Sequence, residues 1–466
     1  MKKPARRTNS APTQAGFGRS DITPRLGVQL AGYGPYRNRA ATEIVAPLHA
    51  RAMWVQQGRE RAIIVSLEVC GLSRELDLCI RERVAKAVRL QPDEVFLSVT
   101  HTHSAPAVGG MLGWGEADPL YVETLATRIV PAVQEAKRNR RRVTWRQAAV
   151  PAEGIAVNRE TDSGFALEAN FAERIKPSWR PEQPEQTDPT VRVLAAYAGE
   201  RLIGLLHHFG CHPVVYGEKT NAVHGDFVGE ASNQLERSHP GAIALFLPGA
   251  LGDINPKLNH RVPGESRRAL RAISRQYAAA IERGLTAGVK GEESTVSSIR
   301  TSVRCRRADW SRGAIEKRIQ KLEHYFATDG VTDQPHERRD PPLHTRGMER
   351  ARLAGLRLVR QQFRGERAPN PPVAIHGLRI GPVVLLGCGL ELYRSLQPAI
   401  LAASPHEHTW LVSLVGGLGY APDAAARKRA GYAADFIPLI VGELPFERIE
   451  VELPAALVRL AKRLAT

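Results

Sequence analysis

The sequence predicts an α/β protein, with a mixed, largely parallel sheet core flanked by helices and one helical insertion. Short apolar runs rich in β-branched residues alternate with segments whose apolar residues recur at helical spacing. Near the N-terminus the order is strand, helix, strand, helix, which favours parallel strands covered by helices. The chain has 466 residues, of which 43% are hydrophobic, so a large core can form.

The first third of the chain predicts a tail, a loop and two strand–helix pairs. Residues 1–15 are rich in Lys, Arg, Ser, Thr and Pro and predict a flexible tail. Glycines and a proline in 21–34 predict a folded loop. The run RAIIVSLEVC (61–70) predicts a buried strand, followed by a helix over 73–90 with Leu76, Ile80, Val84 and Val88 at helical spacing. A second strand is predicted at 94–100 and a second helix at 119–137.

The same alternation recurs further along the chain. Strands are predicted at 201–210 and 242–249, and helices at 228–237 and 267–284. The segment 373–389 predicts a β-hairpin with Gly381-Pro382 near its turn. A last strand begins at 409 and runs into a glycine-rich turn ending at 420, and a helix is predicted from 454 onward. No internal repeat is obvious, and we expect residues 16–466 to form one domain.

A charged segment, about 308–367, interrupts the strands and predicts a helical insertion. Its parts 314–326 and 348–363 have helical spacing, and the segment TDGVTDQPHERRDPP between them predicts a loop. A peripheral solvated hairpin is favoured over a lid.

Composition limits the classes of function. The net charge is +17, but the basic residues are spread along the chain, the densest cluster being KRNRRR (137–142). No nucleic-acid-binding module is recognisable, so a solvated basic surface is favoured over specific nucleic-acid binding. No apolar run of about 18 residues predicts a membrane span; peripheral membrane contact stays open, and the sequence does not indicate an oligomeric state. Five scattered cysteines without a CxxC pair, and the lack of a visible signal peptide, predict a cytoplasmic protein.

Two histidines follow the predicted strand at 94–100, in the stretch SVTHTHSAP. If the strand runs on through Thr102, His101 and His103 point to the same face, which suits a metal ligand beside an acid/base group. Two histidines satisfied by hydrogen bonds at a strand end are the alternative. Strand ends are where ligands bind in parallel α/β sheets.

Two further candidates also follow predicted strands. His212 comes directly after the strand at 201–210, whereas His207 and His208 lie inside it and are expected to be buried and hydrogen-bonded. Glu391 follows the second strand of the predicted hairpin, and its alternative is a helix cap or a surface group. Two histidines and a carboxylate at strand ends match the ligand set of a catalytic zinc with one open position. Spacing alone does not show that they converge.

The block THTHSAP closely resembles the T-H-T-H-S-G-P motif of the neutral (alkaline, non-lysosomal) ceramidases. Other blocks resemble that family in the same order: GFGRSDITPRLGVQLAGYG, VNRE (157–160), CHPVV, GDINPK and GLELY. Tyr420 and Tyr432 match a tyrosine pair of the family. The resemblance runs from about Phe17 to Tyr432 and implies the family's N-terminal catalytic domain.

That resemblance implies roles for eight residues. His101, His212, Glu391 and Tyr420 would bind Zn²⁺. His103, Arg159 and Tyr432 would polarise the substrate or move protons. Arg159 could instead be a surface arginine and Tyr432 a half-buried aromatic. Asn255 stands where the family has a serine thought to contact the substrate, and it cannot act as a nucleophile.

The resemblance implies a zinc-dependent amidohydrolase that cleaves a linear amide, of ceramide or another N-acyl substrate, by metal-activated water. Asn255, and too few residues after Tyr432 for the family's C-terminal β-sandwich, favour a different substrate as the first alternative. That alternative is an esterase, lactonase or other small-molecule hydrolase on the same site. A non-catalytic anion- or nucleic-acid-binding protein is the alternative from another class, based on charge alone.

Overall fold

The computed structural model describes residues 11–161, 170–291, 295–328 and 345–465, and three sheets of four or five strands form most of it. The strand orders are β5-β4-β3-β1-β6, β12-β10-β9-β7-β14 and β15-β16-β17-β19. Two-stranded ladders join β2 with β11, β8 with β13, and β18 with β20. The mixed α/β class predicted from the sequence is confirmed.

The first sheet combines antiparallel hairpin strands with one parallel edge pair. β1 (Gln14–Asp21), β3 (His49–Gln57) and β4 (Glu60–Leu67) pair antiparallel in that order, and β4 then pairs parallel with β5 (Val95–Val99). The connection from β4 to β5 contains α1 (Arg74–Val88), because parallel neighbours need a crossover. β1 begins at Gln14, two residues inside the predicted tail; residues 1–10 lie outside the described residues.

The second and third sheets repeat this topology. In the second, β7 (Thr144–Pro151), β9 (Thr190–Ala198) and β10 (Arg201–Phe209) are antiparallel, and α4 (Asp226–Ser238) crosses over to parallel β12 (Ile243–Pro248). In the third, β15 (Val296–Val303), β16 (Val373–Ile380) and β17 (Val383–Cys388) are antiparallel, and α8 (Gln397–Ala403) leads to parallel β19 (His408–Val412).

The described residues therefore contain three copies of one strand–strand–strand–helix–strand unit, which the sequence did not reveal. Each unit has one parallel pair, β4·β5, β10·β12 or β17·β19, while its other main pairs are antiparallel. Antiparallel pairs are thus more frequent than the sequence pattern suggested. Alternating strand and helix signals mark the crossovers, but they do not show the direction of the strands that precede them.

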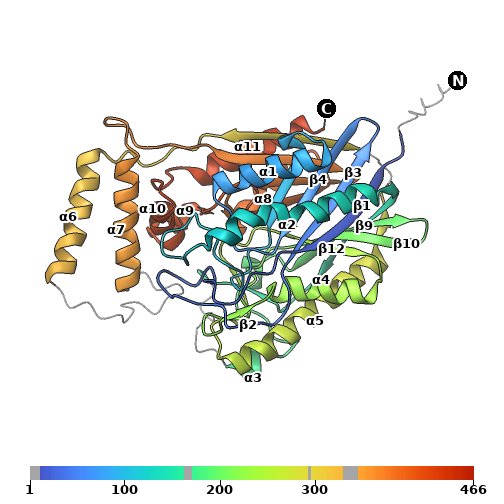
Figure 1. Cartoon of the computed structure of the whole chain (residues 1–466), viewed down its shortest axis with the longest axis horizontal. Coiled ribbons are helices and arrows are strands. Elements are labelled where there is room, and N and C mark those ends of the chain that lie inside the picture. Colours follow the sequence, from blue (N-terminus) through green and yellow to red (C-terminus); the bar gives the residue numbers. More distant parts are fainter. Residues whose placement is uncertain (1–10, 162–169, 292–294, 329–344, 466) are drawn as a thin grey trace.

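The inner faces of the three sheets share one apolar core, and helices cover the outer faces. Phe96 of the first sheet, Leu206 of the second and Leu385 of the third belong to the same buried cluster. α1 and α2 (Pro119–Arg138) cover the first sheet, and α4 and α5 (Pro263–Ala287) cover the second (Figure 1). α8 and α11 (Ile449–Arg463) pack on the third.

The predicted insertion contains two packed helices at one end of the molecule (Figure 1). α6 (Arg312–Thr328) and α7 (Arg346–Gln361) share an apolar cluster with Leu439 and Leu444. The loop predicted between them lies outside the described residues. α7 is more than a peripheral hairpin, because Met348 is buried in the apolar cluster under the third sheet that also holds Trp114 and Phe436.

The remaining elements are short and join the units. They are β2 (Glu43–Ile44), β6 (Arg141–Arg142), β8 (Ala156–Asn158), α3 (Phe171–Arg174), β11 (Ala222–Val223), β13 (Ile254–Pro256), β14 (Val289–Lys290), β18 (Glu391–Leu392), β20 (Tyr420–Ala421), α9 (Ala424–Lys428) and α10 (Ile437–Ile440). Short 3₁₀ turns lie at Pro92–Glu94, Pro184–Gln186 and Arg394–Leu396, and a π-helical turn lies at Tyr432–Phe436. Within the described parts of the chain, no helix is both long enough and apolar enough to cross a membrane.

Candidate metal centre

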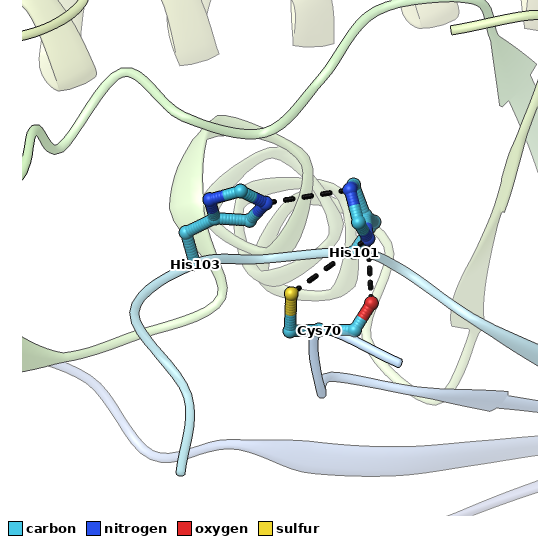
Figure 2. A group of neighbouring side chains, drawn as sticks. All are labelled: Cys70, His101 and His103. Atoms are coloured by element: carbon cyan, nitrogen blue, oxygen red, sulfur yellow. Dashed lines mark hydrogen bonds between the residues drawn. The ribbon is translucent and has the colours of Figure 1, made fainter. Parts of the chain in front are cut away.

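His101 lies just beyond the carboxyl end of β5, in a turn rather than in the strand. The strand ends at Val99, and His101 has a φ of 70°, a conformation that costs a non-glycine residue energy and is often found at functional sites. Its Nδ1 lies 2.5 Å from the carbonyl oxygen of Cys70, which follows the neighbouring strand β4 (Figure 2). Because a carbonyl only accepts, Nδ1 keeps its proton, and Nε2 is the nitrogen that can bind a metal once its own proton is released.

His212 is positioned in the same way by the second unit. It follows β10, and both its backbone N–H and its Nδ1 donate to the carbonyl of Ile254, at 2.9 and 3.0 Å. Ile254 begins β13, which follows β12, so the two strand ends of this unit orient one imidazole. The Nε2 of His212 therefore carries a lone pair, and the ring is 1% exposed.

Glu391 comes from the third unit. It follows β17 and pairs in parallel register with Tyr420, which follows β19. Its Oε2 lies 3.0 Å from the Nε2 of His212 and 3.4 Å from the Nε2 of His101. The carboxylate is buried, so the alternative of a surface group does not hold.

The three side chains converge in a manner that fits a divalent metal ion. Their ligand atoms lie within 4.8 Å of one another, and all three residues are buried. Within the described chain, His212 Nε2 and Glu391 Oε2 are buried without a hydrogen-bond partner, although they face each other. Buried polar atoms normally have partners, and two histidines with a carboxylate are a common zinc ligand set. A divalent metal ion bound between the three residues would satisfy these atoms.

A second group, Cys70, His101 and His103, also brings possible ligand atoms together (Figure 2). The Nδ1 of His101 lies 3.8 Å from the Cys70 sulfur but is already donating to the Cys70 carbonyl. This hydrogen bond opposes metal binding at Nδ1, so the group with His212 and Glu391 is the better candidate centre.

Burial and neighbouring charge set the protonation of the centre. For Glu391, burial favours the neutral acid, but the neighbouring imidazoles of His101 and His212 outweigh it and hold its pKa well below the usual range. Burial also lowers the pKa of His212, to about 4. At His101 burial acts the same way, but the Glu391 carboxylate outweighs it and raises the pKa well above the ordinary value. The anionic carboxylate and the neutral His212 suit a dication, and metal binding would release the proton that Glu391 holds on His101.

Tyr420 and Arg159 line one side of the centre. Tyr420 is buried next to Glu391 in the β18·β20 ladder, and burial raises the pKa of its phenol well above 10. Arg159, directly after β8, donates from Nη2 to the Gly252 carbonyl at 2.8 Å and to Tyr420 Oη at 3.3 Å. Arg159 is therefore not a solvated surface arginine. Whether the Tyr420 oxygen binds metal stays a prediction.

Tyr432 and Asn255 lie in the surroundings of these groups. The Tyr432 ring is 5.9 Å from that of Tyr420 and stacks on Phe436. This position is compatible with a role as a packed aromatic residue and with a role in catalysis. Asn255 is 2% exposed in β13, next to the Ile254 that orients His212. All eight residues that the resemblance singled out thus lie in this region.

His103 is held against the centre by the loop after β1. Its Nε2 lies 3.3 Å from the Nε2 of His101 (Figure 2), and its ring meets the edge of Tyr33 at 5.0 Å. Burial, together with the charges of His101 and His212, lowers the pKa of His103 well below 6.5, so the ring is neutral near neutral pH. A neutral imidazole can either donate or accept a proton at the reacting group.

Sequence reasoning missed three groups that position the site: Cys70, Tyr33 and Asp253. Asp253 accepts from the Arg394 backbone N–H and from the Asn158 side chain, both at 2.8 Å, and its carbonyl accepts from the Arg159 backbone N–H. Burial raises the pKa of Asp253 to about 7. Asp253 follows the predicted strand 242–249, so a search for polar residues after every predicted strand would have found it. Cys70 was included in the predicted strand 61–70, whereas β4 ends at Leu67.

Gly32 offers a test of the position of His103. A Cβ at Gly32 would lie 2.2 Å from His103 Nδ1, and Gly32 has a φ of +89°. Gly32→Ala is expected to displace the His103 ring and lower kcat by about 100-fold, the lower end of the range for a general acid or base, while the content of bound metal stays unchanged. Steady-state kinetics with metal analysis measures both.

Gly27→Ala is the matched control for backbone strain. Gly27 has almost the same φ, +87°, but no atom within 4 Å of an added Cβ. The Gly27→Ala variant is expected to lose about 1–2 kcal/mol of folding stability, because alanine is strained at this positive φ, and to keep kcat unchanged. Equal losses of kcat in the two variants would show that His103 is not the affected group.

The fold and the geometry define an α/β protein with a candidate centre for one divalent metal ion, built where the strand ends of three repeated units meet. The sequence profile of the family described as neutral/alkaline non-lysosomal ceramidase, N-terminal, matches residues 14–269, more than half of the chain. The chain belongs to the neutral/alkaline non-lysosomal ceramidase family.

Individual relatives agree with this assignment. The chain is 24% identical over 276 residues to a protein named neutral ceramidase from Mycobacterium tuberculosis (strain ATCC 25618 / H37Rv), a match that covers 52% of this chain and 40% of that relative. The chain thus spans less than half of that relative's length.

Solved structures show the same fold. The crystal structure of neutral ceramidase from Pseudomonas aeruginosa matches with a TM-score of 0.71 and 18% identity, over 97% of this chain and 75% of that one. A ceramidase complexed with C2 gives a TM-score of 0.71 and 17% identity, over 98% of this chain and 75% of that one.

Proposed function

We propose that this protein is a zinc-dependent hydrolase that cleaves a linear amide bond in an N-acyl substrate. The observation that carries the proposal is the convergence of His101 Nε2, His212 Nε2 and a Glu391 oxygen at a buried point where three units meet. Membership of the ceramidase family supports amide hydrolysis as the reaction. A zinc ion held there would polarise the scissile carbonyl and lower the pKa of bound water to near neutrality.

The surrounding residues account for the rest of the reaction. The guanidinium of Arg159, next to Tyr420, donates hydrogen bonds to the oxygen that becomes negative as the carbonyl is attacked. Neutral His103 takes up a proton and returns it to the leaving amine nitrogen. Tyr420 completes the ligand set, Tyr432 donates to the substrate carbonyl, and Asn255 hydrogen-bonds the substrate near the reacting centre.

A cytoplasmic location remains part of this proposal. All five cysteines are free, including the exposed Cys79, as expected of a protein kept in a reducing compartment. The substrate is a small amide or a lipid-like amide, with peripheral membrane contact required only for the latter.

Metal analysis together with an amide panel tests the proposal. Protein purified without added metal is expected to contain close to one zinc per chain, and to release amine from short N-acyl amides and from ceramide analogues. Chelation is expected to remove activity, and added zinc to restore it. Less than about 0.2 zinc per chain, with no activity regained on zinc addition, would refute the proposal.

Asn255 supports a second candidate function on the same centre, hydrolysis of an ester or lactone. Asn255 lies in β13 beside the residue that orients His212, where it can influence which carbonyl group is accepted. Matched ester and amide pairs with the same acyl chain distinguish the two by kcat/KM. An ester preference greater than the difference in uncatalysed reactivity, reduced in Asn255→Ser, would favour this second function.

A further inference from the structure

A cleft of about 980 Å³ separates the loop after β1 from the inserted helix α7. One wall is the segment Tyr33–Arg37, and the other is the N-terminal half of α7 with Phe326 of α6. The cleft therefore exists only because this chain carries the insertion.

The cleft comes close to the candidate metal centre at Tyr33. Tyr33 lines the cleft, and its ring meets the His103 ring at 5.0 Å. Met348 lines the opposite wall and belongs to the buried cluster that includes Tyr420, against which Tyr432 packs. The cleft thus lies one side chain, Tyr33, away from His103, which borders the candidate metal ligands.

The charge of the cleft is positive. Arg37, Arg346, Arg350 and Arg357 line it together with one acidic residue, Glu323. Glu323 lies 2.7 Å from Arg357, and Arg37 lies 3.6 Å from Glu218. Within the described part of the chain, Arg346 and Arg350 form no ion pair. The Arg350 guanidinium instead lies 5.3 Å from the centre of the Tyr36 ring, where it borders the cleft.

Apolar groups complete the lining. Pro35, Tyr36, Phe326 and Leu353 present carbon surface beside the arginines. Arginine forks bind carboxylates, sulfonates and phosphates through paired charged hydrogen bonds. The cleft thus combines recognition of an anion with room for a hydrocarbon segment.

From this lining we propose that the substrate is an anionic amphiphilic amide, such as an N-acyl amino acid, whose acid group is bound by Arg346 and Arg350. The inference rests on the proposed amide hydrolysis and names its substrate class. Water adds its oxygen to the acyl carbon, the C–N bond breaks, and the amine nitrogen takes the proton, so the products are a carboxylate and an amino acid. A neutral ceramide would leave both arginines unpaired.

Binding of non-hydrolysable analogues tests the inference independently of catalysis. The probes are ketones in which CH₂ replaces the amide NH of N-octanoylglycine, N-octanoyltaurine and the neutral N-octanoylethanolamine. Calorimetry on the protein as purified is expected to give a Kd at least about 10-fold lower for the two anionic probes, the usual gain from charged hydrogen bonds. The advantage is expected to shrink as salt is raised.

Paired variants locate the anion. Arg346→Gln combined with Arg350→Gln is expected to reduce the anionic preference to within about 2-fold, while leaving the Kd of the neutral probe unchanged. Arg360→Gln is the matched control on the same helix, because Arg360 pairs with Glu316 outside the cleft. Thermal unfolding checks that the variants are folded.

A larger cleft of about 1260 Å³ supplies the competing location. Leu418, Arg304 and Arg367 are among the residues that line this second cleft. A preference lost in Arg304→Gln with Arg367→Gln, but kept in the α7 double variant, would overturn the inference. Equal affinity for anionic and neutral probes, or a preference that no variant changes, would overturn it as well. Hydrolysis of amides without an anionic preference would leave the proposed function standing and reject only the substrate class.

Discussion

His212→Ala is expected to remove bound zinc and to lower kcat/KM by more than about 100-fold. The side chain lies 3.0 Å from Glu391 and has its Nδ1 occupied by the Ile254 carbonyl, so its Nε2 is available for a metal. Loss of a residue that only orients a ligand already costs about 10- to 100-fold in metal affinity, and loss of the ligand itself costs more. Metal analysis of the dialysed variant and its kinetics with an N-acyl amide are the measurements.

Two other histidines make the result specific. His239→Gln changes a half-exposed residue that pairs with Glu282, and is expected to keep both zinc and activity. His103→Ala is expected to keep zinc but lose activity, because His103 lies beside the ligand set rather than in it. Full zinc occupancy in His212→Ala, with activity retained, would show that the cluster is a structural histidine–carboxylate group.

Arg159→Met is expected to lower kcat by about 10²- to 10³-fold with zinc content unchanged. This is the range for removing one donor to a developing oxyanion. Methionine keeps the apolar stem of the side chain but cannot donate the hydrogen bonds that Arg159 directs at Gly252 and Tyr420. The separate values of kcat and KM, together with metal analysis, measure the effect.

Arg429→Gln is the control for a general loss of positive charge near the site. Arg429 forms an ion pair with Glu160, the residue after Arg159, and its own side chain is exposed to solvent. Its variant is expected to change kcat by less than about 2-fold, since exposed ion pairs contribute little. A rise in KM alone for Arg159→Met would contradict a role in the transition state and indicate substrate binding.

Local sequence patterns predicted the main elements well. β4, β5, β10, β12 and β19 overlap strands predicted from apolar β-branched runs, and α1, α2, α4 and α5 overlap predicted helices. His207 and His208, expected to be buried and hydrogen-bonded, bond to Tyr277 and Ser232 and to the Leu411 carbonyl respectively. These features depend on neighbours close in sequence or on burial of a whole strand, and both leave a periodic signal.

The sequence did not predict the backbone conformation of the histidine pair correctly. A strand through Thr102 would place both rings on one face, but the chain turns at His101 with positive φ. The two Nε2 atoms still approach to 3.3 Å, because the turn is held by the hydrogen bond from the His101 backbone N–H to the Val69 carbonyl. No composition rule predicts a left-handed histidine, since its strain is balanced by tertiary contacts.

The sequence by itself determined which residues follow buried strands, and so supplied the candidate ligands His101, His212 and Glu391. Only the tertiary structure decided that they meet, because three units with the same topology direct their parallel strand ends to one point. It also decided which nitrogen of each histidine faces that point, through carbonyls of Cys70 and Ile254. Strand ends are set by local periodicity, whereas convergence and tautomer depend on contacts between residues far apart in sequence.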